Sequence, residues 1–107
     1  MKLITAIVGK EDASSVEHGL VSEGFSVTRL ATTGGFLHAG NVTFLIAVKD
    51  ESVDDAISVI AEHSRERKQF MPATTSFGTG ITEAYPIEVT VGGATLFVQH
   101  IERFEKL

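Results

Sequence analysis

A pair of adjacent glycines lies beside an aromatic ring and short polar side chains, a combination suited to holding a small ligand. Gly34 and Gly35 carry no Cβ atom, so the backbone there can approach a ligand closely. Phe36 offers a flat apolar face on which a nucleobase could stack. A glycine pair alone is more often a plain turn, so its neighbours make this segment a candidate site. The hydrogen-bonding side chains that flank the pair are Thr28, Thr32, Thr33 and Asn41.

No residue set for covalent catalysis or metal binding is visible in the sequence. With 0 cysteines, disulfides, zinc–thiolate sites and thiol nucleophiles are excluded. Ser14 and Ser15 lie near an expected helix start rather than in a strand–turn–helix nucleophile elbow. The sequence therefore predicts a binding protein, not an enzyme, without a metal or a cofactor. The histidines, which do not have metal-ligand spacing, are His18, His38, His63 and His100.

Length and charge restrict the class of partner. The 107 residues are 43% hydrophobic, which fits one domain with one core. The net charge of −5 offers no broad positive field for nucleic acid, although local backbone N–H groups can still hold a small phosphorylated ligand. The apolar stretch at residues 3–8 is too short for a signal sequence or a membrane span. We therefore expect a cytoplasmic protein that binds neither nucleic acid nor membranes.

The first two thirds of the chain has the pattern of alternating strands and helices. Asp12 is the expected N-cap of a first helix that stops at Gly24. Three segments predict strands because they are apolar or rich in β-branched residues: 3–8, 26–33 and 42–48. A second helix is predicted by apolar residues at helical spacing, namely Val53, Ala56, Ile57, Ile60 and Ala61.

The last third of the chain contains a long segment in which apolar residues recur with neither the helical nor the strand period. Residues 69–85 are predicted to form a mobile loop for a ligand or partner, with a solvated linker as the alternative. After Pro86 the alternation predicts strands at 87–91 and 94–101, and Gly92-Gly93 between them is typical of a two-residue hairpin.

The order of these elements predicts an α+β, ferredoxin-like βαββαβ fold with an added C-terminal β-hairpin strand. Both helices should then lie on one face of an antiparallel sheet. The strand at 42–48 is apolar on both faces, with Phe44, Ile46 and Val48 on one face and Leu45 and Ala47 on the other, so the face that the helices leave bare should be apolar. Self-association is the simplest cover for such a face in a short chain.

Several motifs together resemble one family over nearly the whole chain. They are IVGKED at residues 7–12, ATTGGFL at 31–37, AGN followed by Thr43-Phe44, and PIEVTVGGATLFV at 86–98. This order is similar to that of the PII-like cyclic di-AMP receptors of the nitrogen regulatory PII superfamily. The resemblance implies a single PII-like domain over residues 1–107, a homotrimer, and no turnover. It also implies signal transduction: cyclic di-AMP binds at subunit interfaces, loops 34–41 and 69–85 rearrange, and an unknown effector protein responds.

The resemblance also implies a set of ligand contacts and some departures from them. Arg29, the nearest cation to the expected strand contacts, is predicted to face away from Ser26 and Thr28. The family carries Asn, Arg, Arg and Gly where this chain has Gly24, Ser26, His38 and Ala47. Two alternatives therefore stay open, namely a PII-like trimer for ATP, ADP or AMP, and an oligomeric scaffold without a ligand. The expected contacts are Ser26, Thr28, Gly34, Gly35, Phe36, Leu37, Asn41, Ala47 and Phe97.

Overall fold

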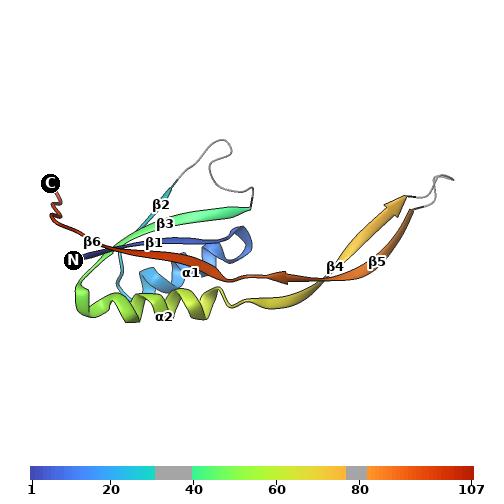
Figure 1. Ribbon diagram of the computed structural model, residues 1–107, viewed down its shortest axis with the longest axis horizontal. Helices are drawn as coiled ribbons and strands as arrows, with labels where there is room; N and C mark the ends of the chain where they lie inside the picture. Colours follow the sequence, from blue (N-terminus) through green and yellow to red (C-terminus); the bar gives the residue numbers. More distant parts are fainter. Residues whose placement is uncertain (31–39, 77–81) are drawn as a thin grey trace.

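An antiparallel sheet with the strand order β2–β3–β1–β6 forms the centre of the molecule (Figure 1). The computed structural model describes residues 1–30, 40–76 and 82–107. Strand β1 lies in the middle of the sheet, between β3 and β6. The outer strand β2 pairs with β3. The strands run over Lys2–Gly9 (β1), Val27–Leu30 (β2), Asn41–Val48 (β3) and Ala94–His100 (β6).

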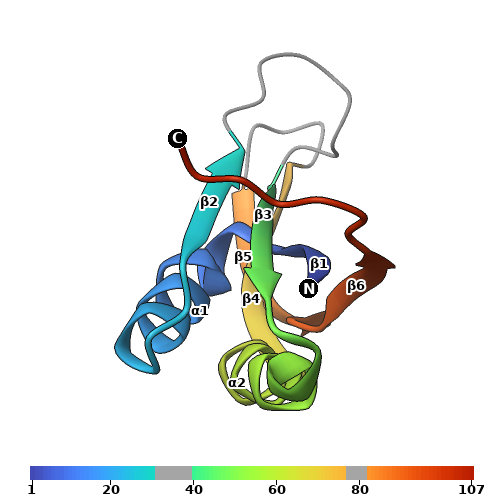
Figure 2. The same cartoon turned by 90° about the vertical axis from the view of Figure 1, so that its left-hand side faces the viewer.

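Helices α1 (Lys10–Ser22) and α2 (Val53–His63) lie on the same face of this sheet (Figure 2). A short 3₁₀ turn, η1 (Asp50–Ser52), precedes α2. Strand order and antiparallel pairing are those of two split βαβ units, so the ferredoxin-like α+β prediction is confirmed. The first helix begins at Lys10 after Gly9, without a side-chain cap, so the predicted N-cap role of Asp12 is wrong.

The core lies between the sheet and the helices. Along α2, Ala56 and Ile60 are fully buried, as the periodicity predicts, but Ala61 is exposed and Val59 packs on the core instead. The second strand was expected at residues 26–33 and is observed over Val27–Leu30, while 31–33 lie outside the described residues. The core residues are Ile4, Ala6, Val8, Ala13, Val16, Leu20, Phe44, Ile46, Val48, Ala56 and Ile60.

Residues 69–85, predicted to be a loop, belong largely to a two-stranded ribbon. Strands β4 (Arg67–Ser76) and β5 (Thr82–Val91) pair antiparallel, and the ribbon extends away from the sheet and helices (Figure 1). Residues 77–81 lie outside the described part. The side chains of 67–70 and 86–88 are exposed, so the ribbon base lacks the buried face that creates an alternating pattern. The opposed prolines, Pro72 and Pro86, also interrupt the usual strand signal.

The expected hairpin at Gly92-Gly93 does not form. Strand β5 pairs with β4, and β6 pairs with β1, so the glycines join the ribbon to the sheet. Both have positive φ, 89° and 83°. A Cβ atom on Gly92 would lie 2.2 Å from the carbonyl oxygen of Arg65, which makes glycine necessary there. Strand β6 is therefore the fourth strand of the ferredoxin-like sheet, and the β4–β5 ribbon is the addition to the fold.

The base of the ribbon is tied to the first turn of α1. The Arg67 guanidinium lies 2.9 Å (Nη2) and 3.3 Å (Nη1) from the carboxylate oxygens of Asp12, whose side chain is only 8% exposed. Nη1 also donates to the carbonyl oxygen of Arg65, at 3.0 Å. The hydrogen bonds that Arg67 donates to the Asp12 carboxylate raise the pKa of Arg67 above its ordinary value. This ion pair satisfies a buried carboxylate and sets where the ribbon leaves the domain.

No described element of this chain covers the other face of the sheet. Leu45 and Ala47 lie there, because Phe44, Ile46 and Val48 are buried on the helix side. Their partners in register on β1 are Thr5 and Leu3. The same face holds Thr43, which is 4% exposed and whose Oγ1 has no hydrogen-bond partner among the described residues.

Replacing Arg67 by Gln should lower the melting temperature of the free protein, because the buried Asp12 carboxylate loses its charged donors. The matched control is Lys68→Gln, since Lys68 pairs with Glu88 at 3.3 Å on an exposed stretch of the same ribbon. Thermal unfolding followed by circular dichroism should show a clear decrease for the first variant and almost none for the second. Equal effects would contradict a special role for the Asp12–Arg67 pair.

Replacing Thr43 by Val should raise the free energy of unfolding by about 1 kcal/mol, because the variant keeps the shape and removes a buried hydroxyl that has no hydrogen-bond partner among the described residues. Thr95, in the same row of the sheet through Ile7, is exposed and supplies the control Thr95→Val, for which we expect little change. Urea unfolding measures both. A destabilised Thr43→Val protein would mean that this hydroxyl is hydrogen-bonded in solution.

Candidate ligand-binding site

The structure places five of the nine expected contact residues. Gly34, Gly35, Phe36 and Leu37 lie outside the described residues. The others fall on β3, on β6, and on β2 or the residue directly before it. These five are Ser26, Thr28, Asn41, Ala47 and Phe97.

Thr28 and Phe97 share one row on the uncovered face of the sheet. In register, Thr28 lies opposite Leu45, Leu45 opposite Thr5, and Thr5 opposite Phe97. Directly opposed residues of an antiparallel sheet point to the same face. Phe97 is 54% exposed there, so its ring is free to meet another molecule. Three strand spacings separate the two residues, which puts their backbones roughly 14 Å apart.

Ser26 and Ala47 line one recess, of about 730 Å³. The pairing of Val27 with Ile46 brings Ser26 next to Ala47. Gly24, with a φ of 90° and nothing within 4 Å of its would-be Cβ atom, opens the same recess. Three of the four positions that depart from the family pattern therefore gather in one place. Ser52 of η1 and three residues of α2, namely Asp55, Ser58 and Val59, also line this recess.

Asn41 lies at the other end of β3, in a second recess of about 490 Å³. Six residue steps along the strand separate it from Ala47, which corresponds to about 20 Å. Gly40, with a φ of 101°, accepts a hydrogen bond of 2.5 Å from the backbone N–H of Lys10 and thereby holds the beginning of β3 against α1. Asn41 shares its recess with Gly92 and Gly93 at the ribbon base.

Arg29 lies on the helix side of the sheet, as strand alternation predicts. Its Nη2 lies 3.2 Å from Oε2 of Glu17, and its guanidinium carbon lies 5.4 Å from the ring centroid of Phe44. Both contacts are on the face opposite to Thr28 and Phe97. Arg29 is thus engaged within its own subunit and does not face the expected ligand contacts.

The sequence did not reveal a contact between the two helices. Ser15 Oγ and His63 Nδ1 lie 2.9 Å apart, and a Cβ atom on Gly19 would come within 2.6 Å of His63 Nε2. Gly19 therefore allows α1 and α2 to approach closely, although by propensity it only weakens a helix. Since the other ring nitrogen packs against Gly19, the Ser15–His63 contact links the two helices.

Some kinds of site are lacking from the part of the chain that the structure describes. Residues 1–30, 40–76 and 82–107 hold no group of three or more His, Cys, Asp or Glu side chains arranged for a metal ion. Within the same residues, neither helix has the length and the apolar character needed to span a bilayer. The described site consists instead of hydroxyls, an amide, small residues and one exposed aromatic ring.

Comparison with known proteins identifies the group to which this arrangement belongs. The chain is similar to a structure described as that of a functionally unknown protein from Pediococcus pentosaceus ATCC 25745, with 38% identity and a TM-score of 0.77. The match covers 99% of this chain and 96% of that one. The profile of the cyclic-di-AMP receptor family matches residues 1–107. The chain therefore belongs, over its full given length, to the cyclic-di-AMP receptor family.

Proposed function

We propose that this protein is a trimeric signal transduction protein that binds cyclic di-AMP at its subunit interfaces and responds by rearranging its loops. The observation that carries the proposal is the family match over residues 1–107. A receptor family implies reversible binding without turnover, and the Ser15–His63 contact lies between α1 and α2 rather than among the expected ligand contacts.

The distribution of the contact residues supports a ligand shared between subunits. Thr28 and Phe97 lie on the same face about 14 Å apart, and Asn41 lies about 20 Å along β3 from Ala47. These residues do not converge on one cavity of a single chain. A closed oligomer would bring Phe97 of one subunit toward the β2–β3 side of the next and would cover the bare apolar face.

The side chains fit the chemistry of a cyclic dinucleotide. Its two adenines need apolar surfaces for stacking, which the exposed ring of Phe97 supplies and which Phe36 is expected to supply. Its ribose hydroxyls and phosphodiesters need short hydrogen-bonding groups, and Ser26 and Thr28 are exposed and of that kind.

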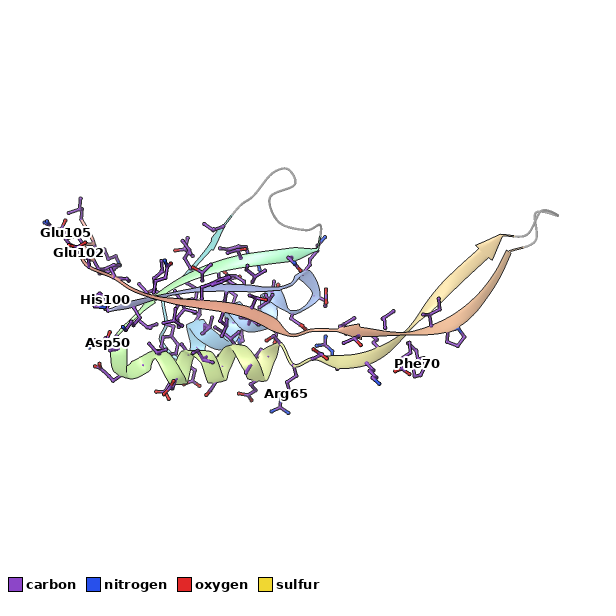
Figure 3. The ribbon with its side chains drawn as sticks, in the orientation of Figure 1. Asp50, Arg65, Phe70, His100, Glu102 and Glu105 are labelled. Carbon is purple, nitrogen blue, oxygen red and sulfur yellow. The ribbon has the colours of Figure 1, made fainter. Side chains whose placement is uncertain are left out.

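The ribbon is the surface that we expect an effector protein to read. Phe70, which is labelled in Figure 3, is 68% exposed, and Ile87 is 42% exposed. They lie on adjacent strands and on opposite faces of the ribbon, because Phe70 pairs with Glu88 and Ile87 pairs with Met71. Pro72 and Pro86 have no N–H group to offer along the ribbon edges, which disfavours uncontrolled strand pairing there. An effector would therefore recognise side chains of the ribbon rather than extend its sheet.

Isothermal titration calorimetry with cyclic di-AMP, ATP, AMP and cyclic di-GMP tests the ligand, and sedimentation equilibrium tests the trimer. We expect heat with cyclic di-AMP at one ligand per subunit, and a mass three times that of the chain. Selective binding of ATP or AMP would favour a PII-like trimer with another adenine ligand. The absence of heat with all four nucleotides would favour an oligomeric scaffold without a ligand. A monomeric mass would contradict a pocket shared between subunits.

Replacing Phe97 by Ala should weaken cyclic di-AMP binding at least tenfold, because base–aromatic stacking contributes about 1–3 kcal/mol per base. Phe104 is equally exposed, at 54%, but lies in the C-terminal segment beyond β6, so Phe104→Ala is the matched control. Calorimetry should give a weaker Kd for the first variant and an unchanged Kd for the second. Loss of affinity in both variants would point to a general effect of removing exposed aromatics.

A further inference from the structure

We propose that Lys49 is the residue that neutralises a phosphodiester of the ligand, in the recess that it shares with Ser26 and Ala47. This inference rests on the proposed cyclic di-AMP function and names the charge that the proposed site requires. Cyclic di-AMP carries two negative phosphodiesters, yet none of the five described contact residues is charged. A dianion bound beside uncharged groups alone would keep an unpaired charge in a partly desolvated place, which is unfavourable.

Lys49 is the basic side chain that lines this recess. It directly follows β3, two residues beyond Ala47, and immediately precedes the turn η1 that leads into α2. Ser26, Ser52 and Ser58 also line the recess, and serine hydroxyls can donate to phosphate oxygens. The first turn of α2, with its partial positive charge, borders the same space and favours an anion there.

The charge of Lys49 is not engaged by the described part of its own subunit. The ion pairs there involve other residues, and the neighbouring Asp50 is held by the amino group of Met1 at 2.9 Å. The hydrogen bond from that amino group lowers the pKa of Asp50 below its ordinary value, so this carboxylate is both ionised and occupied. Arg29 is occupied in the same way by Glu17, on the other face of the sheet.

Two carboxylates, Glu23 and Asp55, line the recess together with Lys49. Both are exposed, so solvent screens their repulsion of an anion, but they should still weaken its binding. Removing a positive charge and removing a negative charge from this recess should therefore change the affinity for cyclic di-AMP in opposite directions. Removing the cation should weaken the binding of cyclic di-AMP, and removing the Asp55 charge should strengthen it.

The experiment measures Kd for cyclic di-AMP by calorimetry at low and high salt, for the wild-type protein, Lys49→Gln, Lys49→Arg and Asp55→Asn. Lys49→Gln should bind about tenfold more weakly and with a smaller dependence on salt, because one charge-assisted contact is lost. Lys49→Arg should retain most of the affinity, and Asp55→Asn should bind a few-fold more tightly. Arg65→Gln is the control, because it removes the same positive charge at a distant position. Arg65 lies beyond one end of α2, and Asp50, the neighbour of Lys49, lies beyond the other end (Figure 3).

The outcomes separate this inference from the function on which it rests. If wild-type protein gives no heat with cyclic di-AMP, the proposed function is wrong. If wild-type protein binds and Lys49→Gln binds equally well with the same salt dependence, only the role of Lys49 is refuted. An equal loss in Arg65→Gln would assign the effect to net charge and would also overturn the proposal. Unchanged melting temperatures show that the exposed substitutions leave the fold intact.

Discussion

The burial of Phe44 and Ile46 beneath α1 and α2 orients the candidate contact residues that lie on the described strands. Because side chains alternate along a strand, packing these residues against the helices turns Leu45 and Ala47 to the opposite face. Antiparallel register then carries the same division to Thr28 on β2 and to Phe97 on β6. A slip of one residue in this pairing would exchange core and binding face, so the core protects the geometry of the site.

A second constraint acts where the ribbon joins the domain. Asp12 is buried in the first turn of α1 and receives the guanidinium of Arg67, while Gly92 passes close to the carbonyl of Arg65. The C-terminal ends of α2 and β5 and the beginnings of β4 and α1 meet at this point. A two-stranded ribbon is marginal by itself in water, so this anchorage to the folded domain contributes to its order. The neighbouring recess reaches from Asn41 to Gly92, so an expected ligand contact and the ribbon base border the same space.

The five expected contact residues that the structure describes are spread over the bare face and two recesses rather than collected in one cavity. Such a distribution is unusual for a monomeric binding protein, whose pocket normally encloses its ligand. It is consistent with a site completed by symmetry, in which different parts of one surface serve two neighbouring interfaces. Lys49, the basic residue that lines the recess, directly follows β3 and lies outside the Gly34-Gly35 motif of the sequence.

The amino-acid sequence by itself determined the order of strands and helices of the ferredoxin-like sheet, since burial on one face leaves a periodic trace in β3 and α2. It also determined the family, because the motifs around Gly34-Gly35 and Gly92-Gly93 are local and specific. The ribbon was missed, because exposed strands carry no alternating pattern, and the predicted hairpin at Gly92-Gly93 was wrong, because pairing partners are chosen by the whole sheet. Only the tertiary structure decided that Asp12 binds Arg67, 55 residues later in the chain, and that Lys49 shares a recess with Ser26, because no local pattern encodes which distant charges meet.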